Sequence, residues 1–418
     1  MKVLIKRANI VSPSSPFHGT LQDILIENGI FADIGNDLNH SADKTIEADG
    51  LHVSSGWVDC FANFCDPGQE FKETLETGAN AAAAGGFTQV MLIPNTSPVV
   101  YNKSQVEYLI QKSKELPVQI FPIGSITKNA EGKELSEMYD MYNTGAIAFS
   151  DGINPVQSSG ILQKALEYIL AIDATIIQLP DDKSIGSSGL MNEGAVSTRL
   201  GLAGKPAISE ELMIARDIEL ARYTNSKIHF TGVSTAKSLE LIAAAKKEKL
   251  RVTCSVTPYH LFFCEEDLVT YDTNLKVNPP LRTKKDRDAL IDGIKNGTVD
   301  FIASHHLPQD WDNKVCEFEY AKNGMEGLES VFGAARACGV SMEQFVKMQT
   351  ENTRAIFKIE EALIDIGKKA NITLFNPGEE YVFEEMNIVS KSKNNSFIGK
   401  TLKGKVIGII SGEKLSLK

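Results

Sequence analysis

The sequence predicts an α/β protein in which a (β/α)8 barrel carries a small β-sandwich assembled from both chain ends. Short apolar runs alternate with helical patterns between about residues 56 and 365. Residues 1–55 and 366–418 instead alternate apolar and polar positions around turn residues. The length of 418 residues allows one large core and a second, smaller one. We therefore expect a composite domain of 1–55 with 366–418, and a barrel domain of 56–365.

The first predicted strands lie in KVLIKRANIV and ILIENGIFADIG, where an Asn-Gly pair supplies a turn. After residue 366 the segments ANITLFNP, EYVFEEM and GKVIGIISGEKLSL repeat this pattern of short strands and turns. Two β segments that flank a long middle predict one sandwich built from both ends.

The middle of the chain contains runs typical of buried parallel strands, which read as nearly continuous apolar stretches. In order, these runs are GWVDCFA, TQVMLIP, VQIFPIGS, AIAFS, TIIQLP, KIHFTGV, RVTCSVT and VDFIAS. Helical patterns lie between them at 73–84, 104–115, 160–172, 209–224, 236–247 and 284–296. This alternation indicates a (β/α)8 barrel, whose active sites lie at the carboxyl ends of the strands.

Composition and charge exclude several classes of function. The net charge is −11, from 43 basic and 54 acidic residues, and no block rich in Lys or Arg occurs, so we expect no nucleic-acid partner. The amino-terminal apolar run is short and is interrupted by Lys6 and Arg7, and no later run reaches the length of a membrane span. Six scattered cysteines without a CxxC pair indicate reduced thiols, and we expect a cytoplasmic protein.

The first barrel strand and its loop read GWVDCFANFCDPG. Alternate strand residues project to the same side, so Phe61 and Asn63 should point into the barrel. A His-x-His pair at these places would share one metal ion, but phenylalanine cannot ligate and asparagine offers only a neutral amide oxygen. Cys65 is a single thiol without partner ligands, so we interpret it as a thiol and not as a metal ligand.

Several motifs together resemble the dihydroorotase family of the amidohydrolase superfamily. They are PGQEFKETLETGANAAAAGGFT, PNTSP, GAIAFSDG, the segment from GLMNEGAVSTRLG to ISEELMIARDIELA, SVTPYHLFF, VNPPLR, GMEGLES and NTRAIF. They follow one another in order over most of the chain. The resemblance implies the barrel with its split β-sandwich, and hydrolysis or closure of the dihydroorotate ring by a zinc-activated water in pyrimidine biosynthesis.

The same resemblance implies which positions would hold the metal and the substrate. Phe61, Asn63, Leu179 and Gly232 stand at metal-ligand positions, His305 at the catalytic aspartate, Cys65 at the arginine that grips the substrate carboxylate and Gln309 at a substrate-binding histidine. Asp151 is retained from the ligand set, and His306 is also retained. Asn95 and Asn278 correspond to residues that contact the substrate ring, so we interpret them as vestigial binding residues.

These substitutions fall on the catalytic machinery, whereas framework motifs such as VNPPLR stand nearly whole. One retained aspartate cannot hold zinc, because a catalytic zinc site needs about three protein ligands. We therefore expect no cofactor and no intact catalytic residue. A new ligand set of His305, His306, Cys65 and Asp151 is disfavoured, because alternation points the two histidines in opposite directions.

Three functions remain open from the sequence. The first is a catalytically silent homologue that serves as a structural or regulatory partner of aspartate carbamoyltransferase, with which family members assemble. The second is an active dihydroorotase or cyclic amidohydrolase with an unorthodox site. The third is a small-molecule sensor that uses Asn95 and Asn278. The family also implies a homodimer.

Overall fold

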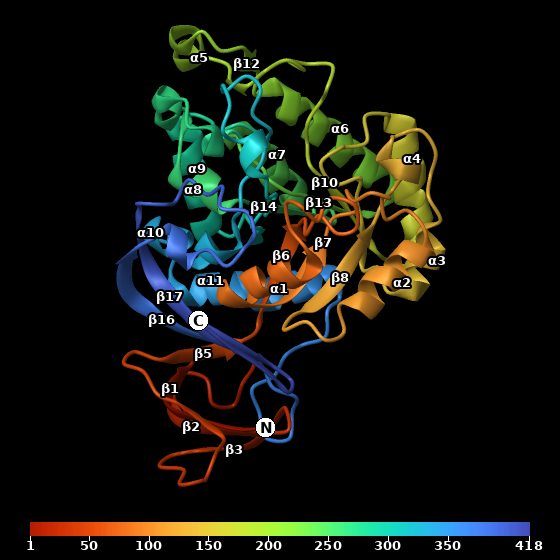
Figure 1. Ribbon diagram of the computed structural model, residues 1–418. Coiled ribbons are helices and arrows are strands. Elements are labelled where there is room, and N and C mark those ends of the chain that lie inside the picture. Colours follow the sequence, from red (N-terminus) through yellow and green to blue (C-terminus); the bar gives the residue numbers. More distant parts are fainter.

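A barrel of parallel strands forms the centre of the computed structural model, which describes residues 1–418 (Figure 1). In chain order its strands are β6 (Trp57–Ala62), β7 (Phe87–Leu92), β8 (Gln119–Gly124), β9 (Ala148–Phe149), β10 (Thr175–Gln178), β13 (Lys227–Phe230), β14 (Val252–Val256) and β15 (Phe301–Ile302). Each is a neighbour of the next in one eight-stranded sheet. Between β15 and β6 a parallel bridge from His306 to Ala62 nearly closes the barrel. The predicted (β/α)8 barrel is therefore confirmed.

The helices surround the barrel strands (Figure 1). They include α1 (Leu75–Ala84), α2 (Lys103–Lys112), α3 (Met138–Thr144), α4 (Ser159–Tyr168), α6 (Ile208–Thr224), α7 (Ala236–Lys247), α9 (Lys284–Lys295), α10 (Val331–Ala337), α11 (Met342–Lys347) and α12 (Thr353–Phe357). The side chains of Thr74, Asn102, Ser158, Thr235 and Thr283 accept hydrogen bonds from the first turns of α1, α2, α4, α7 and α9. These caps satisfy amides that have no partner within the helix, which is why the helices begin there.

A second eight-stranded sheet combines both ends of the chain. Its strands are β1 (Lys2–Ile10), β2 (Leu21–Glu27), β3 (Ile30–Gly35), β4 (Lys44–Ile46), β5 (His52–Ser55), β16 (Asn371–Val382), β17 (Thr401–Ser411) and β18 (Lys414–Leu417). The two chain ends meet where β16 pairs antiparallel with β5. The expected Asn-Gly turn joins β2 to β3, and Asn28 and Gly29 both have the positive φ that a tight hairpin turn needs.

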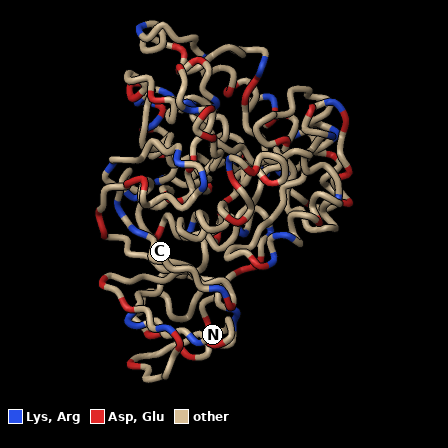
Figure 2. Tube along the Cα trace, in the orientation of Figure 1, with Lys and Arg blue, Asp and Glu red and all other residues tan.

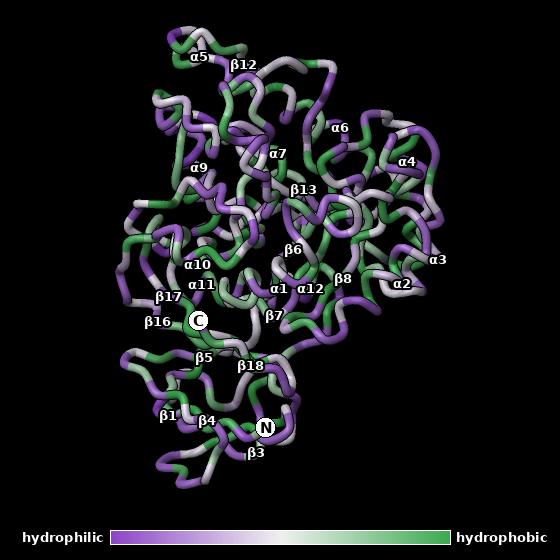
Figure 3. Tube along the Cα trace, viewed as in Figure 1, coloured by the Kyte–Doolittle hydropathy of each residue, from purple (hydrophilic) through white to green (hydrophobic).

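Aromatic packing connects the barrel to this second sheet. Trp57, at the start of β6, is fully buried and has its ring centroid 5.3 Å from that of Phe375 on β16. Phe332 and Phe345 lie 4.9 and 5.0 Å from the same tryptophan. Hydrophobic segments run through both the barrel and the terminal sheet (Figure 3). The barrel is therefore anchored to the sheet at the end where its strands begin.

Charged residues of both signs are interspersed along the chain (Figure 2). No helix has both the length and the apolar character needed to cross a lipid bilayer. The strands β11 (Met191–Asn192) and β12 (Gly204–Lys205) form a separate two-stranded sheet beyond the barrel, next to α5 (Ala195–Leu200). These short elements and α3 were not among the predicted elements.

Candidate functional site

Four of the positions that the resemblance assigns to the metal centre come together at the carboxyl ends of the barrel strands. The rings of Phe61 and His305 stack with centroids 4.4 Å apart and planes 28° apart. A Cβ atom placed on Gly232 would lie 2.7 Å from His305 Cε1 and 3.2 Å from Leu179 Cδ1. The structure thus places Phe61, Leu179, Gly232 and His305 in one tightly packed group.

His305 is held as a neutral ring inside this group. Burial lowers the pKa of the imidazole to about 3, and the nearby His260 contributes in the same direction. His305 Nε2 lies 2.7 Å from Thr231 Oγ1, whereas its buried Nδ1 has no hydrogen-bond partner. A ring whose pKa is this low takes up a proton poorly at neutral pH, so His305 is a weak general base.

A chain of buried polar groups continues from His305 across the barrel interior. Ser255 Oγ donates to Thr231 Oγ1 at 3.0 Å, and His229 Nε2 lies 3.0 Å from the same serine hydroxyl. The His229 ring stacks on Phe301 with centroids 4.7 Å apart, and burial holds its pKa well below the ordinary value. His229 is therefore a neutral, packed residue of the barrel interior.

The side chain of Asn63 is occupied by hydrogen bonds to nearby backbone groups, one of them the amide of Cys65. Asn63 Oδ1 accepts a hydrogen bond from the Cys65 amide at 2.8 Å, and its Nδ2 donates to the Asn95 carbonyl at 3.3 Å. Burial raises the pKa of the Cys65 thiol to about 12. At neutral pH Cys65 is therefore a protonated thiol, and a metal ion would have to displace this proton before it could bind.

Asp151 is committed to a neighbouring loop. Its carboxylate accepts hydrogen bonds from the Thr127 amide at 2.9 Å and from the Thr127 hydroxyl. In the whole chain no three His, Cys, Asp or Glu side chains are arranged to hold a metal ion. The donor set therefore does not fit the zinc centre that the family implies, because such a centre needs about three protein ligands.

The raised pKa of Asp151 predicts a specific pH dependence. Burial raises this pKa to about 6, above the value near 3.8 expected in the unfolded chain. The contribution of Asp151 to stability is therefore complete below about pH 3.8 and is lost as the pH rises through about 6. We expect Asp151→Asn to remove this loss. The free energy of unfolding of the wild type, minus that of the variant, should therefore decline from pH 4 to pH 7 when both are measured in urea titrations.

Asp140→Asn, an exposed substitution of the same kind on α3, is the control for the loss of one surface charge. A wild-type-minus-Asp151→Asn difference that stays constant, or that increases with pH, would contradict the assignment of a raised pKa to Asp151.

Asn95 and Asn278, the two residues expected to contact a substrate ring, lie in different surroundings. Asn95 Nδ2 donates to the Asp151 carbonyl at 3.1 Å, and its Oδ1 accepts from the Ile153 amide at 3.0 Å. Asn278 Nδ2 donates to Asp181 Oδ2 at 3.1 Å, and its Oδ1 accepts from Lys205 Nζ at 2.7 Å. Asn95 thus connects the loop after β7 to the segment 151–153, whereas Asn278 lines a polar pocket.

The ion pair of Lys205 and Asp181 in that pocket is a feature that the sequence did not indicate. Lys205 Nζ lies 2.7 Å from Asp181 Oδ2. Lys205 is the last residue of β12, where it pairs with Asn192 of β11. The position of Asp181 just past a predicted strand was the one signal available, because carboxyl ends of barrel strands hold functional side chains.

His306 points to a second group of buried charges that the sequence also did not indicate. Its Nε2 lies 3.4 Å from Glu73 Oε2 and its Nδ1 lies 3.8 Å from Glu326 Oε1, and all three side chains are fully buried. Burial alone would lower the pKa of His306, but Glu326 and Glu73 raise it to about 10. The Gly327 amide also lies 3.3 Å from His306 Nδ1, where a neutral ring could accept its hydrogen bond. The two flanking carboxylates favour instead the doubly protonated, positively charged ring.

These charges anchor the segment before β17. Ser390 Oγ donates to Glu73, and Asn395 Nδ2 donates to Glu326 Oε2 at 2.5 Å. The amide of Ser390 donates to Glu329 Oε1 at 2.9 Å. Burial and the charge of Glu326 raise the pKa of Glu329 well above its ordinary value, so the two neighbouring glutamates hold one proton between them. The cluster is a structural clamp rather than a reaction centre.

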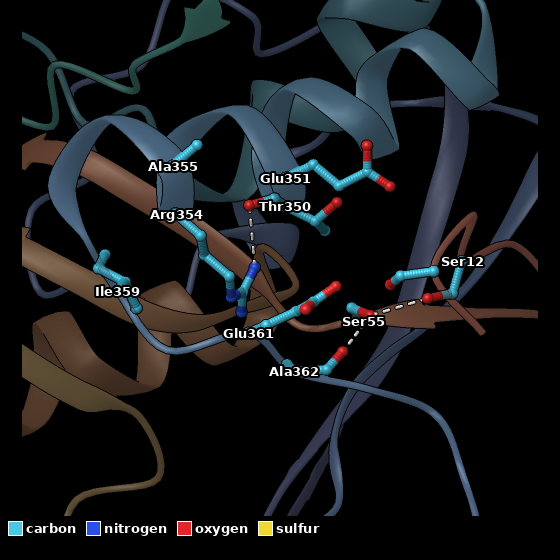
Figure 4. Close-up of a pocket in the computed structure, with 10 residues that line it drawn as sticks. Ser12, Ser55, Thr350, Glu351, Arg354, Ala355, Ile359, Glu361 and Ala362 are labelled. Carbon is cyan, nitrogen blue, oxygen red and sulfur yellow. Dashed lines mark hydrogen bonds between the residues drawn. The ribbon is translucent and has the colours of Figure 1, made fainter.

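A pocket of about 250 Å³ lies at the opposite end of the barrel, where Ser12, Ser55 and Arg354 face one another (Figure 4). The Arg354 guanidinium donates to the Gly56 carbonyl at 2.7 Å and to Gln89 Oε1 at 2.9 Å. Its Nε donates to the Glu360 carbonyl, and its Nη1 donates to the Thr350 carbonyl. Active sites of (β/α)8 barrels lie at the other face, so we interpret Arg354 as a structural residue that links α12 to the starts of β6 and β7.

Comparison with known proteins gives consistent relatives. The sequence model of the family described as Dihydro-orotase-like matches residues 51–238. A protein of Acetivibrio thermocellus named dihydroorotase is 41% identical over 410 residues, which cover 97% of this chain and 96% of that protein. One of Aquifex aeolicus with the same name is 37% identical over 424 residues and covers both chains completely.

Among solved structures, the L-hydantoinase (dihydropyrimidinase) from Arthrobacter aurescens is similar with a TM-score of 0.86 at 22% identity, over 100% of this chain and 96% of that one. The dihydropyrimidinase from Brevibacillus agri is similar with a TM-score of 0.84 at 21% identity, over 100% of this chain and 95% of that one. Because both identities are low, these two similarities show a shared fold and nothing about function.

Proposed function

The chain belongs to the dihydroorotase family, and on this premise we propose that it is a catalytically silent member of pyrimidine biosynthesis that acts as a structural or regulatory partner. The observation that carries the proposal is the group of Phe61, Leu179, Gly232 and His305. These residues stand where the resemblance places metal ligands and the base, yet they pack against one another. Ring hydrolysis in the family uses a metal-activated water and a base.

The decisive experiment is elemental analysis combined with a dihydroorotate assay in both directions. We expect substoichiometric zinc in the purified protein, and no hydrolysis or ring closure above background after incubation with zinc. The Aquifex aeolicus relative, assayed in parallel, is the control for the method. Stoichiometric zinc together with turnover would refute the proposal.

We propose aspartate carbamoyltransferase as the partner, as the resemblance implies. We also propose that this protein is located in the cytoplasm. The framework motifs of the family stand nearly whole, whereas the metal-site positions are substituted. This contrast supports a structural role, which needs the fold but not the catalytic residues. We expect the carbamoyltransferase to co-purify from the host under mild conditions, and mixing of the two proteins to give a larger particle by light scattering. No carbamoyltransferase in the eluate, together with no change in size or activity on mixing, would contradict this partner.

A second candidate is an active dihydroorotase or cyclic amidohydrolase with an unorthodox site. Its support is the identity of 41% over 97% of the chain to a protein named dihydroorotase. His305 would then be the residue nearest the reaction, and we would expect His305→Ala to abolish turnover. Measurable turnover in the wild type that His305→Ala removes would favour this candidate over the silent one.

A further inference from the structure

Three cationic side chains meet on one carboxylate at the amino ends of neighbouring barrel strands. Asp173 lies just before β10, Lys227 is the first residue of β13, and Arg251 directly precedes β14. These strands are neighbours in the sheet, so their starts lie side by side. Lys358 directly follows α12. The fold therefore brings together four charged groups that are far apart in the sequence.

The three cations all contact Asp173. Lys227 Nζ and Lys358 Nζ lie 2.8 and 2.5 Å from Asp173 Oδ2. Arg251 Nη2 lies 2.5 Å from Asp173 Oδ1. Hydrogen bonds from Lys227 and Lys358 hold the pKa of Asp173 well below its ordinary value, so this carboxylate is ionised at neutral pH. One negative charge thus faces three positive charges, which leaves two positive charges uncompensated in a chain whose net charge is −11.

Most hydrogen-bond donors of this cluster have no partner in the protein. Arg251 uses one of its five N–H groups on Asp173, and Lys358 uses one of its three. Both side chains are accessible, with 37% and 47% of their surfaces exposed. Lys227 is more enclosed and uses a second N–H on the Asp173 carbonyl at 3.2 Å. The unpaired donors of Arg251 and Lys358 are therefore free to bind an anion from solvent.

A pocket of about 270 Å³ adjoins the cluster. Asp173 and Lys358 line it on the polar side, and Tyr142, Ile356 and Phe357 contribute apolar surface. A pocket of this kind binds the apolar part of a ligand, while a few polar groups fix its orientation. The arrangement suits a ligand with an anionic group at one end and an apolar body.

We propose that this site binds a phosphate monoester whose organic group is small and apolar. The phosphate accepts hydrogen bonds from Arg251 and Lys358, and the organic group enters the pocket beside Phe357. A phosphate dianion matches the two uncompensated positive charges, and the planar fork of an arginine matches two phosphate oxygens. The site lies at the opposite end of the barrel from the packed group of Phe61 and His305 and needs neither a metal ion nor turnover. It therefore does not depend on the function proposed above.

Three probes test the charge and the apolar group separately. Phenyl phosphate carries about two negative charges at pH 8, and phenyl sulfate has nearly the same shape but one charge. Inorganic phosphate lacks the ring. We expect calorimetric titration at low ionic strength to show phenyl phosphate binding about tenfold more tightly than either of the others. Failure of phenyl phosphate to bind, or an affinity equal to that of phenyl sulfate or of inorganic phosphate, would overturn the proposal.

A pair of arginine substitutions tests the location of the site. Arg251→Gln removes the guanidinium of the cluster. Arg222→Gln on α6 is the matched control, because Arg222 is 39% exposed and also pairs with carboxylates. We expect Arg251→Gln to weaken phenyl phosphate binding about tenfold and Arg222→Gln to leave it unchanged. Equal affinities in the two variants would place the binding elsewhere and overturn the proposal.

Asp173→Asn gives a result that a purely structural cluster would not. It removes the one negative charge that competes with the ligand for the three cations, so we expect phenyl phosphate to bind about threefold more tightly. An unchanged or weaker affinity in the folded variant would contradict the proposal. If this variant fails to fold, the three probes and the arginine pair still decide. A failure of this site would leave the zinc and turnover assays unaffected.

Discussion

Gly232→Ala is expected to lower the free energy of unfolding by about 2–5 kcal/mol. About 1–2 kcal/mol arises because Gly232 has φ +70°, a left-handed conformation in which an alanine is strained. The remainder arises because the new Cβ would lie 2.7 Å from His305 Cε1 in a fully packed group. Equilibrium unfolding in urea, followed by circular dichroism, measures the change.

Gly201→Ala is the matched control for this substitution. Gly201 has φ +68°, and nothing lies within 4 Å of the position its Cβ would take, so only the backbone cost of about 1–2 kcal/mol should appear. The double variant Gly232→Ala/His305→Ala should recover part of the packing cost in a double-mutant cycle. Equal effects of the two glycine substitutions would contradict the packed arrangement of Gly232, Leu179 and His305.

Glu73→Gln is expected to destabilise the protein by about 3–5 kcal/mol, because it removes one partner of a buried, charged histidine. The effect should depend on pH. The pKa of His306 is about 10 in the folded protein, against about 6.5 in the unfolded chain. Its contribution is therefore complete below about pH 6.5 and is lost as the pH rises through about 10. The difference between wild type and variant should accordingly shrink from pH 6 to pH 10.

Glu76→Gln, an exposed acid-to-amide change three residues further on in α1, is the control and should alter stability by no more than about 0.5 kcal/mol. Chemical denaturation of wild type and both variants at several pH values provides the measurement. A Glu73→Gln effect that is as small as the control, or that grows toward pH 10, would argue against a charged His306 between the two glutamates.

The long elements of the barrel could be predicted from the sequence because their patterns are local. The run KIHFTGV contains β13, and the pattern at 236–247 coincides with α7, whose bounds are set by the Thr235 cap and the apolar face of the helix. The elements β11, β12 and α5 were not predicted. They are too short to show a period, and they are stabilised by contacts with distant parts of the chain.

The candidate site shows the same division. The identities of Phe61, Leu179, Gly232 and His305 are visible in the sequence, and the resemblance indicated that they should meet. Their stacking and close approach could not be predicted, because they depend on how residues at the ends of four strands fill one space. The pocket of Asp181 and Lys205 depends in addition on the pairing of β12 with β11, which no local pattern signals.

The sequence by itself determined the alternation of strands and helices, the split of the terminal sheet between both chain ends, and the family to which the chain belongs. Periodicity and motifs act over short stretches, so they are readable without a structure. Only the tertiary structure decided which side chains face one another: Phe61 on His305, His306 between Glu73 and Glu326, and Asp181 with one free oxygen. The physical reason is that burial and charge pairing arise between residues that are far apart in the chain, and they exist only after the barrel has closed.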